Sequence, residues 1–483
     1  MGVLSGLKPE KVFENFEMLC SVPHGSGNTK QISDLIVAWA KERGFAVRQD
    51  AANNVVIRKE ASPGYEQAPP VILQGHIDMV CASEPDCGID MRRDGLNLVI
   101  DRDWIKAKGT SLGGDNGIAV AITMAILDDA SLRHPRIEAV FTTDEETGMD
   151  GAMALDASDL TAKNMINLDS EKEGFLTVSC AGGVRVDCRF AADWESASPG
   201  QVFYSVTIDG LKGGHSGVEI DKGRASAIEL MGRFLWQARQ ATGLRLCRLT
   251  GGSFTNVIPL SCTATVMLPQ EKAEFLKALC QELEATFRAE YAAADPGLRM
   301  RCESALPCER AASDEKTDAV LKMLLLSPYG VQAMSMDIPG LVQTSLNLGV
   351  AATGEDGFTL STSVRSSIQS QKELLVERLR TLCGVLGGQM STHGAYPGWA
   401  YRKDSPLRDA LAASCTRVLG KEPEITATHG GLECGLFVDK IPGLDCISLG
   451  PDLFEVHSVR ERLSIRSTQR LYRIVCDFLE NWH

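Results

Sequence analysis

Hydrophobic and polar positions follow two different patterns along the chain, and the change near residue 183 indicates separate domains. In the first part, apolar residues recur at helical spacing in some segments and form short continuous runs in others. These patterns predict helices over 30–43 and 117–127 and strands over 54–58, 70–74, 137–143 and 165–168. Strands that alternate with helices predict an α/β domain built on a mostly parallel sheet.

From about residue 184 to residue 395, the segments FYSVTID, CTATVML and FTLSTSV instead alternate apolar and polar residues. They predict an α+β domain whose antiparallel strands have one packed and one solvated face. The helices predicted within this domain cover 225–241, 271–293 and 372–386. After it the first pattern returns, with a helix over 406–419, a strand over 424–428 and a last helix from about 467. We therefore expect one α/β domain in two segments, 1–183 and 396–483, with an inserted α+β domain over 184–395.

Composition narrows the class of protein. The chain has 483 residues, too many for one ordinary core, and its 44% hydrophobic and 23% charged shares are those of a globular protein. A net charge of -14 argues against nucleic acid and anionic membranes as partners. The N-terminal residues lack the pattern of a signal peptide, and no apolar run approaches the ~20 residues of a membrane helix. The cysteines are scattered without a CxxC pair, so we expect buried thiols in the reducing cytoplasm.

Several side chains that can bind metal stand at the carboxyl ends of predicted strands or in the turns that follow. They are His76, Asp78, Asp115, Glu145, Glu146 and Asp169. Open α/β sheets place their sites at the carboxyl ends of the strands, so we expect these side chains to share one edge. Imidazole and carboxylate donors suit Zn²⁺ or Mn²⁺, and one histidine is too few for a closed structural zinc site. The set fits an open site in which a carboxylate bridges two ions roughly 3.5–4 Å apart.

The adjacent pair Glu145-Glu146 is the strongest candidate for chemistry. Neighbouring turn residues can point in different directions, so one carboxylate can bind metal while the other acts as general base on an activated water. A second histidine ligand is also needed, and His457 is the best placed, since it lies in a loop just before the last helix. Taken alone, each of these residues would be an ordinary surface turn residue.

Eight motifs together resemble a known family. QGHIDMV, GTSLGGDNGIA, TTDEETGMDGA, INLDSEKEG, SCAGG, LKGGHSG, HGGLECGLF and EVHS, in this order and spacing, are similar to those of the two-zinc exopeptidases related to carboxypeptidase G and carnosinase. The resemblance runs from about Ser21 to the last helix. It implies an α/β catalytic domain with the inserted α+β domain as a lid. It also implies two divalent ions, with Zn²⁺ as first choice and Mn²⁺ or Co²⁺ as alternatives.

The resemblance assigns the metal ligands by position. Asp115 would bridge the two ions. Glu146 and His457 would complete the shell of one ion, and His76 and Asp169 would complete that of the other.

The same resemblance assigns the proton transfer. Glu145 would take a proton from the bridging water and pass it to the leaving amine, while Asp78 would orient the ligand His76. The HGGLECGLF loop, which contains His429 and Glu433, is similar to the family's and is expected to line the pocket, with no role assigned to either residue.

In the lid, the resemblance implies that His215 stabilises the oxyanion of the tetrahedral intermediate. Asn256 and Arg365 would hold the substrate, Arg365 through the C-terminal carboxylate. One departure concerns residues 455–456, which are Glu-Val where relatives usually have Gly-Pro before the last His-Ser. It puts the shape of that loop and the substrate preference in doubt, rather than the role of His457.

The leading hypothesis is a cytoplasmic metallo-dipeptidase for unblocked dipeptides, those ending in histidine included and β-Ala-His among the candidates. One alternative is a related enzyme that removes an acyl group from an amino acid, and another is a metal-free binding protein, which the intact ligand positions disfavour. We expect a small peptide as substrate, with a homodimer compatible with the sequence. A lid of roughly 210 residues is about twice a single α+β unit of ~110 residues, so His215 is expected to serve the active site of its own chain.

Overall fold

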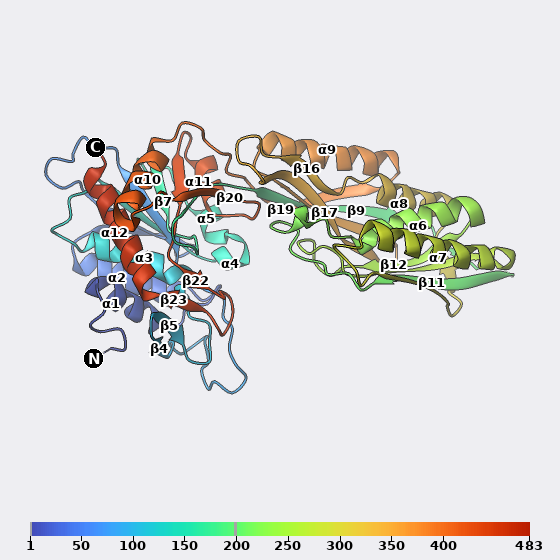
Figure 1. The fold of residues 1–483 in the computed structure, drawn as a ribbon, viewed down its shortest axis with the longest axis horizontal. Coiled ribbons are helices and arrows are strands. Elements are labelled where there is room, and N and C mark those ends of the chain that lie inside the picture. The colour runs from blue at the N-terminus through green and yellow to red at the C-terminus, as the bar shows by residue number, and fades with distance from the viewer. Residues whose placement is uncertain (1, 198–199) are drawn as a thin grey trace. The chain divides into compact units, whose positions relative to one another are not determined.

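The computed structural model describes residues 2–197 and 200–483, which form two compact units (Figure 1). The first unit comprises residues 2–180, 399–427 and 432–483, and the second comprises 181–398 and 428–431. The chain leaves the first unit over residues 181–398 and again, briefly, over 428–431. Within the described residues, no helix has both the length and the apolar character that a membrane crossing requires.

The first unit is built on a mixed sheet in the order β1-β2-β6-β3-β7-β21-β8-β20. Its strands are β1 (Ala46–Gln49), β2 (Val55–Lys59), β3 (Val71–His76), β6 (Ile137–Thr142), β7 (Asn164–Asn167), β8 (Phe175–Cys180), β20 (Glu424–Thr428) and β21 (Asp445–Ser448). The central strands β6, β3, β7 and β21 are parallel, and β1, β2 and β8 are antiparallel to their neighbours. Every residue of β3 and β6 is buried, which explains why these strands appear as continuous apolar runs.

Four helices of the first unit match those predicted over 30–43, 117–127, 406–419 and from about 467, whereas those that begin at residues 10, 145, 150 and 434 were not predicted. The helices of this unit are α1 (Glu10–Cys20), α2 (Lys30–Glu42), α3 (Gly114–Leu127), α4 (Glu145–Gly148), α5 (Asp150–Ala154), α10 (Pro406–Leu419), α11 (Cys434–Lys440) and α12 (Ile465–Asn481). Helix α10 has the predicted limits because its ends are encoded locally. The Ser405 hydroxyl accepts a hydrogen bond from the Arg408 amide, Pro406 opens the helix, and Gly420 ends it in the left-handed conformation.

A second, small sheet of the first unit was not predicted. It has the order β22-β23-β5-β4 and consists of β22 (Leu453–Phe454), β23 (Arg462–Ser464), β5 (Trp104–Ala107) and β4 (Leu98–Asp101). Strands of two or three residues give no periodic signal, and β5 and β23 are far apart in the sequence. This sheet carries the loop that contains His457.

The second unit is built on an antiparallel sheet in the order β14-β11-β13-β12-β17-β18-β9-β19, with β16 paired to β17. Its strands are β9 (Gly182–Ala191), β11 (Gln201–Asp209), β12 (Arg245–Gly251), β13 (Cys262–Pro269), β14 (Arg299–Ser304), β16 (Gly330–Met334), β17 (Val342–Thr353), β18 (Gly357–Ser366) and β19 (Gln389–Tyr396), and β10 (Glu195–Ser196) pairs with β15 (Arg310–Ala311). Burial alternates along β9, β11 and β13, which confirms the predicted packed and solvated faces.

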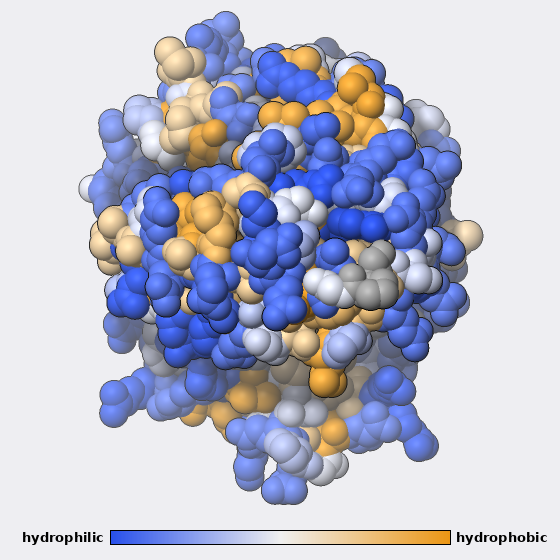
Figure 2. All heavy atoms as spheres, turned by 90° about the vertical axis from the view of Figure 1, so that its right-hand side faces the viewer, coloured by the Kyte–Doolittle hydropathy of each residue, from blue (hydrophilic) through white to orange (hydrophobic). Residues whose placement is uncertain are grey.

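The packed face of this sheet is covered by helices that share its hydrophobic core. They are α6 (Ala227–Thr242), α7 (Ala273–Glu290), α8 (Asp314–Leu326) and α9 (Gln369–Val385), with the short 3-10 helices η1 (Ile220–Lys222) and η2 (Gln270–Lys272) nearby in sequence. Helix α8 was not among the predicted helices, although the Ser313 hydroxyl caps it by accepting from the Lys316 amide. The face drawn in Figure 2 is mainly hydrophilic, with apolar side chains in scattered patches.

Candidate metal centre and active site

Parallel strands bring most of the predicted site residues of the first unit to one edge of its sheet. His76 is the last residue of β3 and pairs with Thr142, the last residue of β6. Glu145 opens α4 three residues beyond β6, and Asp169 follows β7 by two residues. Because the carboxyl ends of parallel strands coincide, these side chains meet as the sequence predicted.

Asp115 lies at the centre of the cluster. Its Oδ1 lies 3.2 Å from Nε2 of His76, and its Oδ2 lies 3.2 Å from Nε2 of His457. The His457 Nε2 is also 2.8 Å from Oε1 of Glu146. Two imidazoles therefore approach the two different oxygens of one carboxylate, which is the arrangement expected of a carboxylate that bridges two ions.

The ring of His76 is held in one orientation. Its Nδ1 is 2.9 Å from the carbonyl oxygen of Asp78 and 3.3 Å from the Asp78 carboxylate. Since both partners are acceptors, Nδ1 carries the hydrogen, and Nε2 faces Asp115 and, at 3.5 Å, Asp169. Asp78 therefore positions His76 through its backbone as well as through its side chain.

The Asp78 carboxylate has a further contact that the sequence did not reveal. It accepts hydrogen bonds from the backbone N–H of Glu145 at 3.1 Å, the backbone N–H of Glu146 at 3.4 Å and the hydroxyl of Ser26 at 2.8 Å. Asp78 is 1% exposed, so these bonds are screened from water. One buried carboxylate thus fixes both the ring of His76 and the turn that carries Glu145 and Glu146.

Burial and the charges of neighbouring residues shift the pKa values of the histidines and of Glu145 in this cluster. Burial opposes ionisation of His76, but Asp169, Asp115 and Asp78 together raise its pKa well above the ordinary value. Hydrogen bonds to Asp115 and Glu146 raise the pKa of His457 to about 10. Burial and the neighbouring carboxylates outweigh the opposite effect of His76 and raise the pKa of Glu145 to about 8.

The donors present suit divalent ions. One ligand atom from each of His76, Asp115 and Glu146 lies within 4.8 Å of the others. Ligand atoms that bind the same ion, each at about 2.0–2.2 Å from it, lie this close to one another. Asp169 extends the cluster through its contact with His76, and His457 extends it through its contact with Asp115, so the residues fit the pair of ions that the family resemblance implies.

Sequence reasoning missed Glu461. Its Oε2 accepts the backbone N–H bonds of Leu112 at 2.8 Å and Gly113 at 3.1 Å, and its Oε1 accepts those of Gly114 at 2.9 Å and Asp115 at 3.3 Å. Burial raises the pKa of Glu461, but the use of both oxygens as acceptors requires the ionised form. Glu461 thereby fixes the loop that presents Asp115. A carboxylate four residues after His457 was the only signal, and it is a weak one.

Glu433, for which the sequence assigned no role, is fully buried under the site. Its Oε2 accepts bonds from Gln74 Nε2 at 2.6 Å and from the Thr142 hydroxyl at 2.7 Å. Gln74 also accepts a bond from Asn167 at 2.6 Å. This network links β3, β6 and β7 directly beneath the residues at their carboxyl ends.

The second unit holds the three predicted lid residues. Nδ1 of His215 accepts the backbone N–H bonds of Gly217 and Val218, each at 3.2 Å, so its hydrogen lies on Nε2, which can donate to another group. Asn256 is exposed, and its backbone carbonyl accepts a hydrogen bond from the backbone amide of Ser216, the residue after His215, at 2.8 Å. Arg365 on β18 is 8% exposed, and its Nη1 donates to the hydroxyl of Tyr396 at 3.2 Å.

His429 joins this group of second-unit residues. Its Nε2 is 2.7 Å from the hydroxyl of Ser345, which pairs across the sheet with Arg365. Burial, with a smaller contribution from Arg365, lowers the pKa of His429 to about 4, so the ring is neutral at physiological pH. Burial and the same arginine also lower the pKa of His215. Arg365 is therefore the cation of a partly buried site flanked by two neutral imidazoles.

Comparison with known proteins relates the whole chain to peptidases. Residues 72–481 match peptidase family M20/M25/M40. The cytosol non-specific dipeptidase of Escherichia coli (strain K12) is 36% identical over 480 residues, which is 99% of each chain. The crystal structure of aminoacylhistidine dipeptidase from Vibrio alginolyticus is also 36% identical, with a TM-score of 0.94 over 99% of this chain and 98% of that one. Aminopeptidase PepT from Bacillus cereus shares the fold at 17% identity, with a TM-score of 0.57 over 98% of both chains.

Proposed function

This chain belongs to peptidase family M20/M25/M40, and from that premise we propose that it is a metal-dependent dipeptidase that hydrolyses unblocked dipeptides. The observation that carries the proposal is the approach of His76 and His457 to the two oxygens of Asp115, with the turn of Glu145 held to the same cluster by Asp78. The names of two full-length relatives support the dipeptide as substrate class, and one of them acts on aminoacyl-histidine. Xaa-His dipeptides, β-Ala-His among them, are therefore the first substrates to examine.

The proposed ligands are those of the sequence prediction. Asp115 would bind both ions, with Glu146 and His457 on one and His76 and Asp169 on the other. Two Zn²⁺ ions, or Mn²⁺ or Co²⁺ in their place, would polarise the scissile carbonyl and lower the pKa of an attacking water.

Glu145 is the proposed general base. It takes the proton from the attacking water and gives it to the leaving amine, which requires a carboxylate close to the ligands but not used by them. The backbone bond from its amide to Asp78 fixes its place relative to His76. A pKa raised by burial favours both steps, because the group must accept and then release a proton near neutral pH.

We propose that residues 184–395 act as the lid and that its polar group contacts the substrate. His215, with its hydrogen on Nε2, would donate to the oxyanion. Arg365 would bind the C-terminal carboxylate, and Asn256 would hold the substrate beside it. We place the enzyme in the cytoplasm, as the name of the Escherichia coli relative says of that protein.

A substrate panel tests the proposal: Gly-His, β-Ala-His, Leu-Gly, Gly-Gly-His and N-acetyl-His. Each is incubated with the enzyme as purified, after chelation, and after Zn²⁺ or Mn²⁺ is restored. We expect metal-restored cleavage of the free dipeptides, with the tripeptide and the acetylated substrate spared. Cleavage of N-acetyl-His alone would make the protein a deacylase instead.

We also propose that one chain supplies its complete active site. An inactive His215→Ala chain is mixed with an inactive Glu145→Ala chain, and dipeptide hydrolysis is measured. The mixture should remain inactive, because neither chain has both groups. Activity that returns on mixing would mean that His215 acts in a partner chain.

A further inference from the structure

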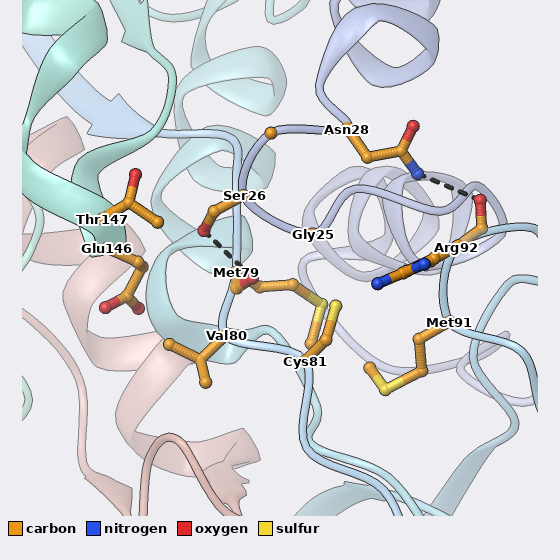
Figure 3. A pocket seen from close by; sticks show the side chains of 11 residues that line it. Gly25, Ser26, Asn28, Met79, Val80, Cys81, Met91, Arg92, Glu146 and Thr147 are labelled. Carbon is orange, nitrogen blue, oxygen red and sulfur yellow. Dashed lines mark hydrogen bonds between the residues drawn. The ribbon is translucent and has the colours of Figure 1, made fainter.

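A cavity of about 730 Å³ adjoins the candidate metal centre, and all of its lining residues belong to the first unit (Figure 3). Glu146 and Thr147 stand at one end, and Met91 and Arg92 stand at the other. Its volume falls in the range of small-molecule sites, roughly 300–1,000 Å³. Two of the sequence motifs supply part of its wall, Met79, Val80, Glu146 and Thr147, but the mechanism above places no part of the substrate in this space.

The cavity wall is fixed to the catalytic residues by hydrogen bonds. The Ser26 amide donates to the carbonyl of Met79 at 3.2 Å, and the Ser26 hydroxyl donates to Asp78 at 2.8 Å. The amide of Gly27 donates to the carboxylate of Asp144 at 2.6 Å. Since Asp78 also holds His76 and the turn of Glu145, the cavity and the proposed ligands form one preorganised structure.

The middle of the cavity is apolar. Met79, which is 2% exposed, lies there with Val80 and Cys81, and Met91, which is 8% exposed, continues the apolar wall to the end at Arg92. Sulfur and methyl groups of this kind adapt to the aliphatic stem of a ligand but offer it no charge. An unbranched aliphatic chain is therefore the shape that this part of the wall accommodates best.

Arg92 closes the end of the cavity remote from Glu146, and its guanidinium points toward Met79 and Cys81 in Figure 3. Its backbone is anchored, because its amide donates to Asp90 at 3.1 Å and its carbonyl accepts from Asn28 at 3.0 Å. The guanidinium itself makes no hydrogen bond or ion pair with any residue that the structure describes. Arg92 is exposed, so the cavity ends near the surface in a guanidinium without an ion-pair partner among the described residues.

We propose that this cavity binds the side chain of the N-terminal residue of the dipeptide and favours an aliphatic stem that ends in a carboxylate, as in glutamate. The inference rests on the proposed function, in which Arg365 takes the C-terminal carboxylate and the scissile bond lies beside Glu146. The N-terminal side chain then needs a site of its own next to Glu146. The carboxylates of Glu146 and Asp90 would repel an acidic side chain, and Arg92 is the group of the cavity that offsets them.

The test compares kcat/KM for Glu-His, Gln-His, Leu-His and Lys-His in the metal-loaded enzyme. Arg92→Met keeps the stem and removes the charge, and Arg92→Glu reverses the charge. Arg93→Met is the matched control, since Arg93 is exposed like Arg92 but does not line the cavity. The wild type and the control should prefer Glu-His over Gln-His roughly fivefold, the size of an accessible ion pair. Arg92→Met should abolish this preference, and Arg92→Glu should favour Lys-His over Gln-His.

The outcomes separate this inference from the proposed function. Suppose that the enzyme hydrolyses Gln-His and Leu-His, and that the ratio of kcat/KM for Glu-His to that for Gln-His is the same in Arg92→Met and Arg93→Met. This result would overturn the role of Arg92 and leave the proposed function intact. Failure of every variant and of the wild type to cleave any of the four dipeptides would overturn the proposed function, and this inference with it. A ratio that approaches one at high ionic strength in the wild type would support the ion pair, because salt screens it.

Discussion

The buried carboxylate of Glu461 offers the sharpest test of how the centre is held. Glu461→Gln replaces one of its two acceptor oxygens with an NH₂ group, so two of the four backbone N–H groups of residues 112–115 would face a donor. Each buried donor without an acceptor costs about 1–3 kcal/mol, so we expect a loss of about 2–6 kcal/mol of unfolding free energy. Because the same loop presents Asp115, metal affinity should also fall, by roughly 10–100-fold.

Two measurements check this expectation. Denaturant unfolding gives the change in stability, and calorimetric titration of the metal-free enzyme with Zn²⁺ gives the change in affinity. The matched control is Glu455→Gln, since Glu455 lies in the same loop but pairs with Arg460 and Arg462 at the surface. Little change is expected for the control. A Glu461→Gln enzyme that unfolds and binds metal like the control would refute the view that this carboxylate fixes the loop.

Three further predictions concern the proton-binding groups. Glu145→Ala should lower kcat by roughly 10²–10⁴-fold or more with metal content unchanged, whereas Asp115→Ala should lose metal and activity together, as metal analysis beside kinetics would reveal. Metal affinity should rise with pH, because neighbouring carboxylates raise the pKa of His457 to about 10 and its proton must leave when the metal binds. Calorimetric titration with Zn²⁺ in buffers of different ionisation enthalpy measures both the affinity and the protons released. An affinity that stays constant from pH 6 to 9, with a binding enthalpy that does not depend on the buffer, would contradict this. Burial in the folded state lowers the pKa of His429 to about 4. As the pH falls below the ordinary pKa of histidine, the unfolded state therefore binds more protons than the folded state, and the free energy of unfolding decreases. His429→Gln should remove about 2 kcal/mol of that loss at pH 5, seen as a flatter dependence of unfolding free energy on pH.

The family, the fold class and several of the longer elements were predictable from the sequence alone. The family prediction is confirmed by the match over residues 72–481, and the fold class is confirmed by the similarity to the Vibrio alginolyticus structure. Elements such as α10 were predictable because capping residues and apolar spacing act within a few positions. Three candidate ligands, His76, Glu146 and Asp169, were likewise visible, because they stand at or soon after the ends of buried strands whose continuous apolar runs are easily recognised.

Only the tertiary structure determined which of these groups meet and what holds them. His457 approaches Asp115 from 342 residues away, and Glu461 joins the same loop through backbone amides that any sequence carries. The small sheet that delivers both residues consists of strands too short to show a period. The cavity that ends at Arg92 depends on four separate segments that pack together, 25–28, 79–81, 91–92 and 146–147. Local propensity is set by neighbouring residues, whereas these contacts depend on how strands distant in the sequence pair, and a single sequence does not contain that information in a readable form.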